Sequence, residues 1–268
     1  MDLRHLFPHL VRFVVLSCAT YGSLRAGTID PSTPDSQYVE FGQKFPYVVQ
    51  LSSKVACQNP ECEFKSHDYK GSAVVIRPHW LLTAAHVVRD GTAHKAILGD
   101  KTEYELPHVV WHKDFDDKSF GVNDIAICYS PKELDMEFYP KLYRKDDEVG
   151  KAITISGWGF HGTFYTGAQK HDGKRRAGQN VITGVQRSSL TCLPRRANKF
   201  PLEFMIAPGD SGGGMFIGNE LAGINSFLMA GDGKPDGTYT DESAFTRVSL
   251  YADWVDEQIK SHEQTLAQ

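Results

Sequence analysis

The sequence predicts an all-β protein with one α-helix near its C-terminal end. Short apolar runs recur along most of the chain and are separated by turns rich in Gly, Asp, Pro and Lys. Helical periodicity is almost absent before residue 250, and many short strands with turn signals are typical of β-sandwiches and β-barrels. The 268 residues are enough for one large domain or two small ones.

The first half of the chain opens with a polar segment, residues 27–36, whose two prolines predict an extended arm. Strand-like runs follow it, and we expect strands at Phe45–Leu51, Gly71–Ile76, Trp80–Thr83, Lys95–Leu98, Tyr104–Trp111 and Asp124–Tyr129. Residues 131–150 are rich in Pro, Lys, Glu and Asp and are predicted to link the two halves of the chain.

The second half contains further runs of the same kind, and we expect strands at Ala152–Gly157, Asn180–Gln186, Pro201–Met205, Gly213–Ile217, Glu220–Phe227 and Ser243–Leu250. Residues 160–178 are predicted to form a mobile surface loop in which Lys174, Arg175 and Arg176 invite nicking. A helix of about residues 250–264 closes the chain, because Tyr251, Val255 and Ile259 are spaced four apart and give it one apolar face.

Residues 1–26 predict a secretory signal peptide. Arg4 and Arg12 precede the apolar run Phe13–Leu16, small residues follow, and the apolar part is too short to span a bilayer. We expect cleavage after Ala26 and a secreted protein; a lipid anchor on Cys18 is the alternative. The later sequence has no stretch long and apolar enough to predict a membrane helix.

The charge balance restricts the class of partner. The formal net charge of −4 argues against nucleic acid or an anionic membrane as the main partner. Two basic groups, Lys174–Arg176 and Arg195–Arg196, are expected to be solvated loops. The hydrophobic content of 41% supports ordinary globular cores.

One stretch, residues 207–214, places a serine among glycines directly after an acid: Ala-Pro-Gly-Asp-Ser-Gly-Gly-Gly. Gly209 lacks a Cβ and can adopt turn conformations that aim its N–H at the same point as the N–H of Ser211. Two convergent amide donors beside a hydroxyl suit an oxyanion hole beside a nucleophile. By itself, the stretch is better explained as a simple glycine turn.

A histidine and an aspartate of the kinds that can activate this serine occur upstream of it. His86 follows the apolar run Leu81–Ala85, and Asp124 stands at the head of another strand-like run. Each residue alone fits a packed side chain or a turn. Together, in the order His, Asp, Ser, they are the residue types that activate a serine hydroxyl.

These motifs resemble those of chymotrypsin/trypsin-like serine peptidases. The resemblance rests on Thr83-Ala84-Ala85-His86, Asp124-Ile125-Ala126 and Gly209–Gly213, with weaker similarity at Ile155–Gly159, Leu221–Phe227 and Phe245–Val248. It extends from about residue 38 to the end. It implies two six-stranded antiparallel β-barrels packed together, one over about residues 38–130 and one over 151–250, within a peptidase domain of residues 27–268.

The resemblance implies a role for each matching residue. His86 is the expected general base, Asp124 its orienting acid and Ser211 the nucleophile that forms an acyl-enzyme. The N–H groups of Gly209 and Ser211 are the expected oxyanion hole. Ser226 is similar to the serine that supports the catalytic acid and begins the strand that pairs with substrate.

The resemblance implies a specificity that differs from that of trypsin. Met205 stands at the base of the primary pocket where trypsin-like members carry an aspartate, so a Lys or Arg side chain there would lose water without gaining a counter-ion. Phe227 replaces a common tryptophan, Leu228 a common glycine, and Ser243 is also assigned to substrate binding. We expect a narrowed apolar pocket that disfavours basic residues.

We interpret the cysteines for a protein that is exported to an oxidising environment, where disulfides form. Cys57 and Cys62 flank a turn-like segment and are predicted to form a disulfide; zinc binding by both with His67 is the alternative and lacks a fourth ligand. Cys128 is expected to be a buried thiol, and Cys192 has no evident partner. Val87 follows His86 where a cysteine is common in the family, which suggests a bacterial-type member.

Activation in this family depends on the acid before the nucleophile, here Asp210, which pairs with a freed N-terminal ammonium. We expect signal cleavage near Ala26, or a second cut close to Ile29, to supply it. The sequence suggests no calcium or other metal site, so no cofactor is expected. The expected partners are protein or peptide substrates and a proteinaceous inhibitor.

Two other classes of function compete with a secreted endopeptidase. A catalytically silent homologue would use the two-barrel surface to bind another protein, but such proteins usually lack a triad residue, and all three are present here. An esterase of another fold would place its serine before the acid and the histidine, which is the opposite order.

Overall fold

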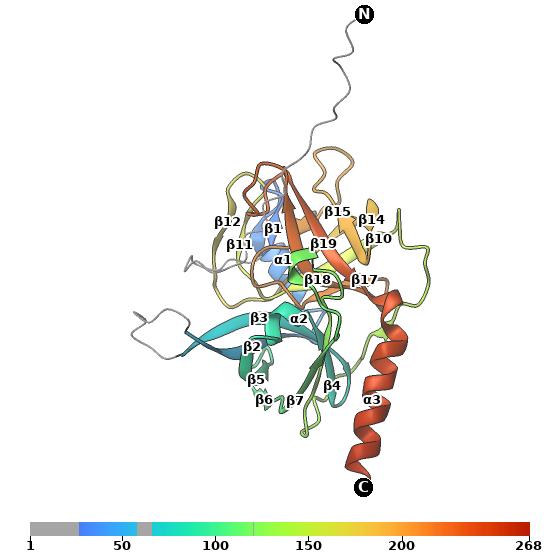
Figure 1. Ribbon diagram of the computed structural model, residues 1–268. Coiled ribbons are helices and arrows are strands. Elements are labelled where there is room, and N and C mark those ends of the chain that lie inside the picture. Colours follow the sequence, from blue (N-terminus) through green and yellow to red (C-terminus); the bar gives the residue numbers. More distant parts are fainter. Residues whose placement is uncertain (1–26, 58–65, 120) are drawn as a thin grey trace, which may run out of the picture.

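The structure is a computed structural model that describes residues 27–57, 66–119 and 121–268. It is mostly β, which confirms the predicted class (Figure 1). Two curled sheets lie one against the other, and the C-terminal helix α3 runs down one side of the molecule. Among the described helices, none is both long and apolar enough to cross a membrane. The proposed signal peptide and Cys18 lie outside the described residues.

The first sheet has seven antiparallel strands in the order β6-β5-β2-β3-β4-β8-β7. Its strands are β2 (Val48–Ala56), β3 (Ser66–Arg77), β4 (Trp80–Thr83), β5 (Gly91–Ile97), β6 (Glu103–Glu105), β7 (His108–Trp111) and β8 (Ala126–Tyr129). The predicted strand Tyr104–Trp111 is divided at Pro107, which has no N–H to donate to a ladder. Its two parts form opposite edges of the sheet, so this short connection curls the sheet toward a barrel.

The second sheet follows the order β13-β10-β17-β18-β19-β15-β14, with β9 beside β18. Its strands are β9 (Lys141–Leu142), β10 (Ala152–Gly157), β13 (Arg176–Val181), β14 (Gly184–Gln186), β15 (Ser189–Cys192), β17 (Gly214–Ile217), β18 (Glu220–Ala230) and β19 (Asp241–Arg247). Buried side chains such as Ile155, Met215 and Phe245 fill the core beneath it.

A small third sheet holds the start of the described chain. Its order is β12-β11-β1-β16, formed by β1 (Thr28–Ile29), β11 (His161–Thr163), β12 (Gly167–Lys170) and β16 (Phe204–Met205). Strand β1 pairs in parallel with β11 and antiparallel with β16. Thr28 and Ile29 are therefore held on both sides, in place of the extended arm expected for residues 27–36.

Helices are short except at the end of the chain. They are α1 (Asp35–Gly42), α2 (Ala85–Val88) and α3 (Ala252–Leu266), with 3₁₀ turns η1 (Asp117–Ser119) and η2 (Val248–Leu250). Helix α1 was not expected, because its eight residues lie in a polar, proline-containing stretch. Pro34 precedes its first turn, where a fixed φ suits a helix start.

Contacts that the sequence does not predict order part of residues 160–178. The Arg176 side chain is 1% exposed and binds the carboxylates of Asp35 in α1 and Asp172. Arg175 donates to the carbonyl oxygens of Gly42 and Val48 at 2.7 and 2.9 Å. The expectation of a mobile, solvated basic loop is therefore wrong at these two residues. Arg195 is likewise paired, with the buried carboxylate of Glu203.

The two sheets share one apolar core with the C-terminal helix. Phe216 and Ile224 of the second sheet cluster with first-sheet residues such as Val74, and with Val255 of α3. Trp158 donates from its indole nitrogen to the carbonyl oxygen of Val48 at 2.8 Å, which joins the two halves by a buried hydrogen bond. The packed junction fixes residues from one half relative to those of the other.

The cysteines agree in part with the sequence analysis. Cys57 is disulfide-bonded, which removes its thiolate from the zinc alternative. Its predicted partner, Cys62, lies outside the described residues. Cys128 and Cys192 are free, buried thiols, and burial raises the pKa of Cys128 to about 12.

Candidate active site

The nucleophile loop lies between β16 and β17 and needs glycine at two positions. Gly209 and Gly212 have φ values of +90° and +84°, which disfavour any residue with a Cβ. A Cβ on Gly212 would also lie 2.1 Å from the carbonyl oxygen of Ser72. The glycines in this stretch are thus required by backbone conformation and close packing.

Asp210 is fully buried beneath this loop. One of its oxygens, Oδ1, accepts from the N–H of Gly159 at 2.9 Å. The other, Oδ2, accepts from the N–H groups of Ala207 at 3.0 Å and Gly27 at 2.7 Å. Burial raises the pKa of Asp210 to about 6 against the opposing effect of these three bonds. No Lys, Arg or His side chain among the described residues forms an ion pair with Asp210.

The start of the described chain is therefore part of the site. Gly27 is buried, and a Cβ there would lie 2.0 Å from the ring of Phe204. Only glycine fits this position without displacing the ring. The structure thus brings together residue 27 and Asp210, which are 183 positions apart in the sequence.

Two amide groups of the loop are left available. Within the described part of the chain, the N–H groups of Gly209 and Ser211 donate no hydrogen bond. The carbonyl of Pro208, which shares a peptide with the Gly209 N–H, accepts from Phe160 N–H at 3.2 Å. The carbonyl of Gly209 accepts from the Ser72 hydroxyl at 3.1 Å. Both donors of the expected oxyanion hole remain free to bind an incoming oxygen.

His86 and Asp124 come from the first sheet and meet as predicted. His86 lies in α2, directly after β4, and its Nδ1 is 2.8 Å from Asp124 Oδ2. The backbone N–H of His86 donates to Asp124 Oδ1 at 3.0 Å. The hydroxyl of Ser226, on β18, also donates to Asp124 Oδ2. These bonds fix the imidazole with Nδ1 toward the acid and Nε2 away from it.

The environment shifts both pKa values. Burial lowers the pKa of His86, but the charge and hydrogen bond of Asp124 outweigh it, so the pKa lies above its ordinary value. Burial raises the pKa of Asp124, but His86 and Ser226 outweigh it, so that pKa lies below its ordinary value. The Asp124 side chain is 1% exposed and that of His86 28%, so only the imidazole faces solvent.

Ser211 lies at the junction of the two sheets. Its carbonyl oxygen accepts from the N–H of Ser72 on β3 at 2.8 Å. Its hydroxyl donates to the carbonyl of Ser226 at 3.5 Å, and no hydrogen bond joins it to His86 among the described residues. Hydrogen bonds of this kind are often long or absent without substrate and form in the complex.

The residues predicted to bind substrate separate into two groups. Met205 and Ser243 are fully buried, and the Ser243 hydroxyl accepts from Ile206 N–H at 3.2 Å. Leu228 lies opposite Ser243 across the β18–β19 pair. Phe227 instead lines a cavity of about 180 Å³ whose walls do not include Met205, Leu228 or Ser243.

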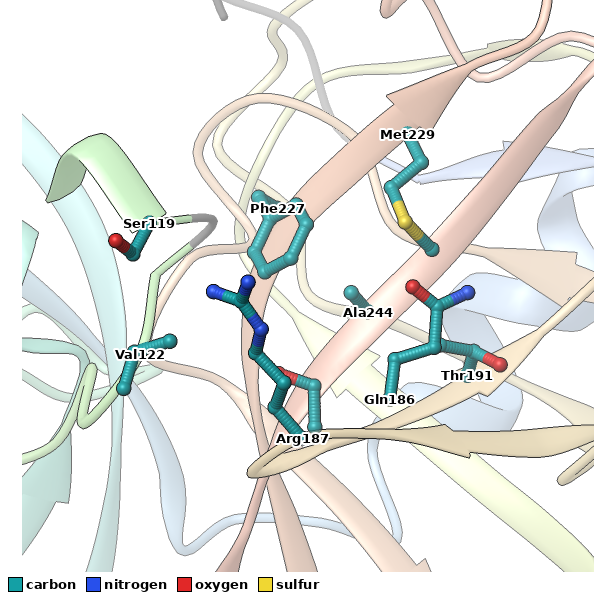
Figure 2. A pocket seen from close by; sticks show the side chains of 9 residues that line it. Ser119, Val122, Gln186, Arg187, Thr191, Phe227, Met229 and Ala244 are labelled. Carbon is teal, nitrogen blue, oxygen red and sulfur yellow. The ribbon is translucent and has the colours of Figure 1, made fainter. Parts of the chain in front are cut away.

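This cavity lies on the side of β18 that Phe227 faces (Figure 2). Met229 lines it as well, because alternate residues of a strand face the same side. Arg187, in the turn between β14 and β15, reaches into the space between Phe227 and Val122. Its φ is +53°, a strained value for arginine. Its side chain forms no ion pair with any described residue.

Comparison with known proteins identifies the family. A family model described as Trypsin matches residues 41–255. The chain belongs to the trypsin family. It is a serine endopeptidase of that family, because the match spans most of the chain and its relatives are proteases.

Individual relatives agree with this assignment. A collagenase of Hypoderma lineatum is 29% identical over 203 residues, covering 68% of this chain and 73% of the relative. The trypsin Tyr p 3.0101 of Tyrophagus putrescentiae is 29% identical over 230 residues, covering 75% of each. These and a rabbit relative, vitamin K-dependent protein C of Oryctolagus cuniculus, give no support to the bacterial-type expectation.

Solved structures show the same fold at low identity. HL collagenase aligns with a TM-score of 0.63 and 21% identity, over 81% of this chain and 94% of that one. Mouse neuropsin aligns with a TM-score of 0.62 and 17% identity, over 81% and 96% of the two chains. Both agree with the two curled sheets and the C-terminal helix.

Sequence reasoning missed several residues that shape the site. Ser72 binds both the Gly209 carbonyl and the Trp158 N–H, yet it stands in a strand like any other serine. Arg187 carries no local motif either, and the signal that singles it out is a positive φ, which only the structure reveals. A chain start near residue 27 was expected to pair with Asp210, but the need for glycine there, where a Cβ would lie 2.0 Å from the Phe204 ring, was not.

The raised pKa of His86 predicts the acid limb of the activity profile. A base must be neutral to accept a proton, so kcat/KM should rise with pH through a midpoint above about 6.5, the ordinary histidine value. Asp124→Asn should lower that midpoint and reduce kcat by about 10⁴-fold. The measurement is peptide hydrolysis from pH 5 to 9, with His79→Gln as control. A midpoint at or below 6.5, or one unmoved by Asp124→Asn, contradicts this account.

Proposed function

We propose that the protein is a secreted peptidase that cleaves peptide bonds through an acyl-enzyme on Ser211, with His86 as general base and Asp124 as its orienting acid. The observation that carries the proposal is the junction of the two sheets, where Ser226 on β18 contacts both parts of the site: its hydroxyl donates to Asp124, the partner of His86, and its carbonyl oxygen accepts from the Ser211 hydroxyl. The same junction presents two free N–H groups.

The chemistry follows from these positions. His86 Nε2 takes the proton of the Ser211 hydroxyl while the Ser211 oxygen attacks the carbonyl carbon of the substrate. The oxyanion that forms accepts from the N–H groups of Gly209 and Ser211, each worth about 2.7–4 kcal/mol in the transition state. His86 then gives its proton to the leaving amine. Water, deprotonated by His86, attacks the ester and releases Ser211.

One observation favours the alternative, a catalytically silent homologue that binds another protein. The Ser211 hydroxyl faces the Ser226 carbonyl and not His86. Rotation about one side-chain bond reverses this orientation, and a bound substrate would compete for the same space. Enzyme assay therefore separates the two candidates.

Hydrolysis should depend on the Ser211 hydroxyl. In Ser211→Ala, kcat on a peptide library should fall by about 10⁶-fold, the loss seen when a serine nucleophile is removed. Ser66→Ala removes a hydroxyl from an exposed strand residue and should leave kcat unchanged. Equal rates for wild type and Ser211→Ala would exclude this nucleophile; a wild type without hydrolysis, correctly processed at its start, would favour the binding homologue.

We further propose that removal of residues 1–26 activates the enzyme directly. Cleavage after Ala26 would turn the Gly27 N–H into an ammonium 2.7 Å from Asp210, whose buried carboxylate forms no ion pair with a side chain of the described residues. The alternative cut near Ile29 would remove Gly27 from this contact. Secretion is supported by the signal-like sequence of residues 1–26.

A single extra residue should block this activation. Protein released to begin at Gly27 should be active, whereas the same protein with one Ala left before Gly27 should lose roughly 10²-fold or more in kcat/KM, the effect of losing an oxyanion donor. Asp210→Asn should remove most of the difference. N-terminal sequencing of secreted protein should read Gly-Thr-Ile-Asp. An active protein that starts far from residue 27 would overturn the proposal.

Specificity is proposed from the two groups of binding residues. The buried Met205 and the half-buried Leu228 are uncharged and favour small or medium apolar side chains in the primary pocket. If substrate pairs with β18, another of its side chains enters the cavity lined by Phe227 and Met229. The unpaired Arg187 favours an acidic side chain there.

A peptide library tests both parts. Lys and Arg should be disfavoured next to the cleaved bond, and Asp or Glu should be preferred at one upstream position by about two- to fivefold, as an exposed ion pair allows. Arg187→Glu should reverse this second preference, while Arg196→Met should leave it. Preferred cleavage after Lys or Arg would refute the Met205 argument. An upstream preference unchanged in Arg187→Glu would refute the other.

A further inference from the structure

Asn225 places a buried amide against the nucleophile loop. It lies on β18, is 0% exposed, and its Nδ2 donates to the carbonyl oxygens of Asp210 and Ser156 at 3.1 Å each. Both partners are acceptors, so the NH₂ group must face them. Its Oδ1 has no partner among the described residues. A buried acceptor without a partner costs stability, so packing alone does not account for an asparagine here.

The bond to Asp210 controls the direction of a different group. The carbonyl of Asp210 and the N–H of Ser211 belong to the same peptide, and none of the described peptides is cis. In a trans peptide the C=O and N–H point in opposite directions. Whatever holds the Asp210 oxygen therefore aims the Ser211 N–H the other way, toward the expected oxyanion.

Two donors hold that oxygen, and they differ in kind. Gly213 N–H donates to it at 2.8 Å, but Gly213 belongs to the loop and moves with it. Asn225 is anchored outside the loop, on β18, and through its second bond it also reaches Ser156 on β10. Its backbone adds two bonds of 2.8 Å, to Gly212 and Gly213. Asn225 thus ties the loop to two strands of the second sheet.

The glycine at 213 fits this arrangement. A Cβ on Gly213 would lie 2.7 Å from Asn225 Nδ2 and 2.4 Å from the Ser156 carbonyl oxygen. The second glycine after the nucleophile therefore leaves room for the amide to pass beneath the loop. Packing thus explains why this position of the motif is glycine, although Gly213 takes no part in the chemistry.

We infer that Asn225 is a positioning residue for the oxyanion hole: its side chain holds the Asp210–Ser211 peptide so that the Ser211 N–H points at the substrate carbonyl oxygen. The inference rests on the proposed function of this site. Asn225 touches no reacting atom, and its effect passes entirely through the peptide that it orients.

The test compares Asn225→Leu and Asn225→Ala with Asn180→Leu. Asn180 is also fully buried in the second sheet, and its Nδ2 binds the Phe204 carbonyl at 3.0 Å, away from the loop. The readouts are kcat, KM and the inhibition constant of a peptide aldehyde, which forms an oxyanion on the serine. Each rate is divided by the concentration of sites titrated by a fluorophosphonate, so that unfolded protein does not count.

Both Asn225 variants should lose about 10- to 10²-fold in kcat, less than removal of a donor outright, with KM changed by less than about threefold. Aldehyde affinity should fall by the same factor as kcat, and Asn180→Leu should change neither per titrated site. The inference is overturned if kcat per site is unchanged, if kcat falls while aldehyde affinity stays, or if Asn180→Leu gives the same pattern. Failure of the proposed function would show instead as an inactive wild type.

Discussion

The buried carboxylate of Asp210 is the constraint on which the site depends. A carboxylate without water must find other donors, and three backbone N–H groups converge on it: that of Ala207 in the same loop and those of Gly27 and Gly159 from distant parts of the chain. Its pKa of about 6 shows that these bonds do not fully replace water. Burial raises the pKa of Asp210 above its ordinary value. The free energy of unfolding therefore falls as pH rises from about 4 through 6 and Asp210 ionises, unless a nearby cation compensates. An ammonium at Gly27 would supply that cation.

This constraint explains how a β-sheet scaffold can hold a reactive loop. Strand β1 is fixed between β11 and β16, so Gly27 reaches Asp210 from a rigid element. The hydrogen bonds of the Asp210 carboxylate in turn hold the loop in place. The Ser72 hydroxyl donates to the carbonyl of Gly209, and the Asn225 amide donates to the carbonyl of Asp210. The loop's N–H groups then point outward without reorganisation during reaction, which is where such sites gain most of their catalytic power.

The sequence predicted the parts of this design that have local signatures. The strands Trp80–Thr83 and Ala152–Gly157 were predicted with their observed bounds, and His86, Asp124 and Ser226 meet as the motifs implied. Helix α1 and strands β11 and β12 were missed, because distant partners stabilise them: α1 through the Asp35–Arg176 ion pair, and β11 through β1. Ser72, Asn225 and Arg187 were missed because a single polar residue in or beside a strand has no pattern of its own.

The most direct measurement is fluorophosphonate labelling of secreted protein, followed by identification of both the labelled residue and the first residue by peptide mass spectrometry. The account predicts a label on Ser211 in chains that begin at Gly27, and no label on chains that retain residues before it. A label on another residue, or Ser211 equally labelled in chains that retain residues 1–26, would contradict the link between the chain start, Asp210 and the nucleophile.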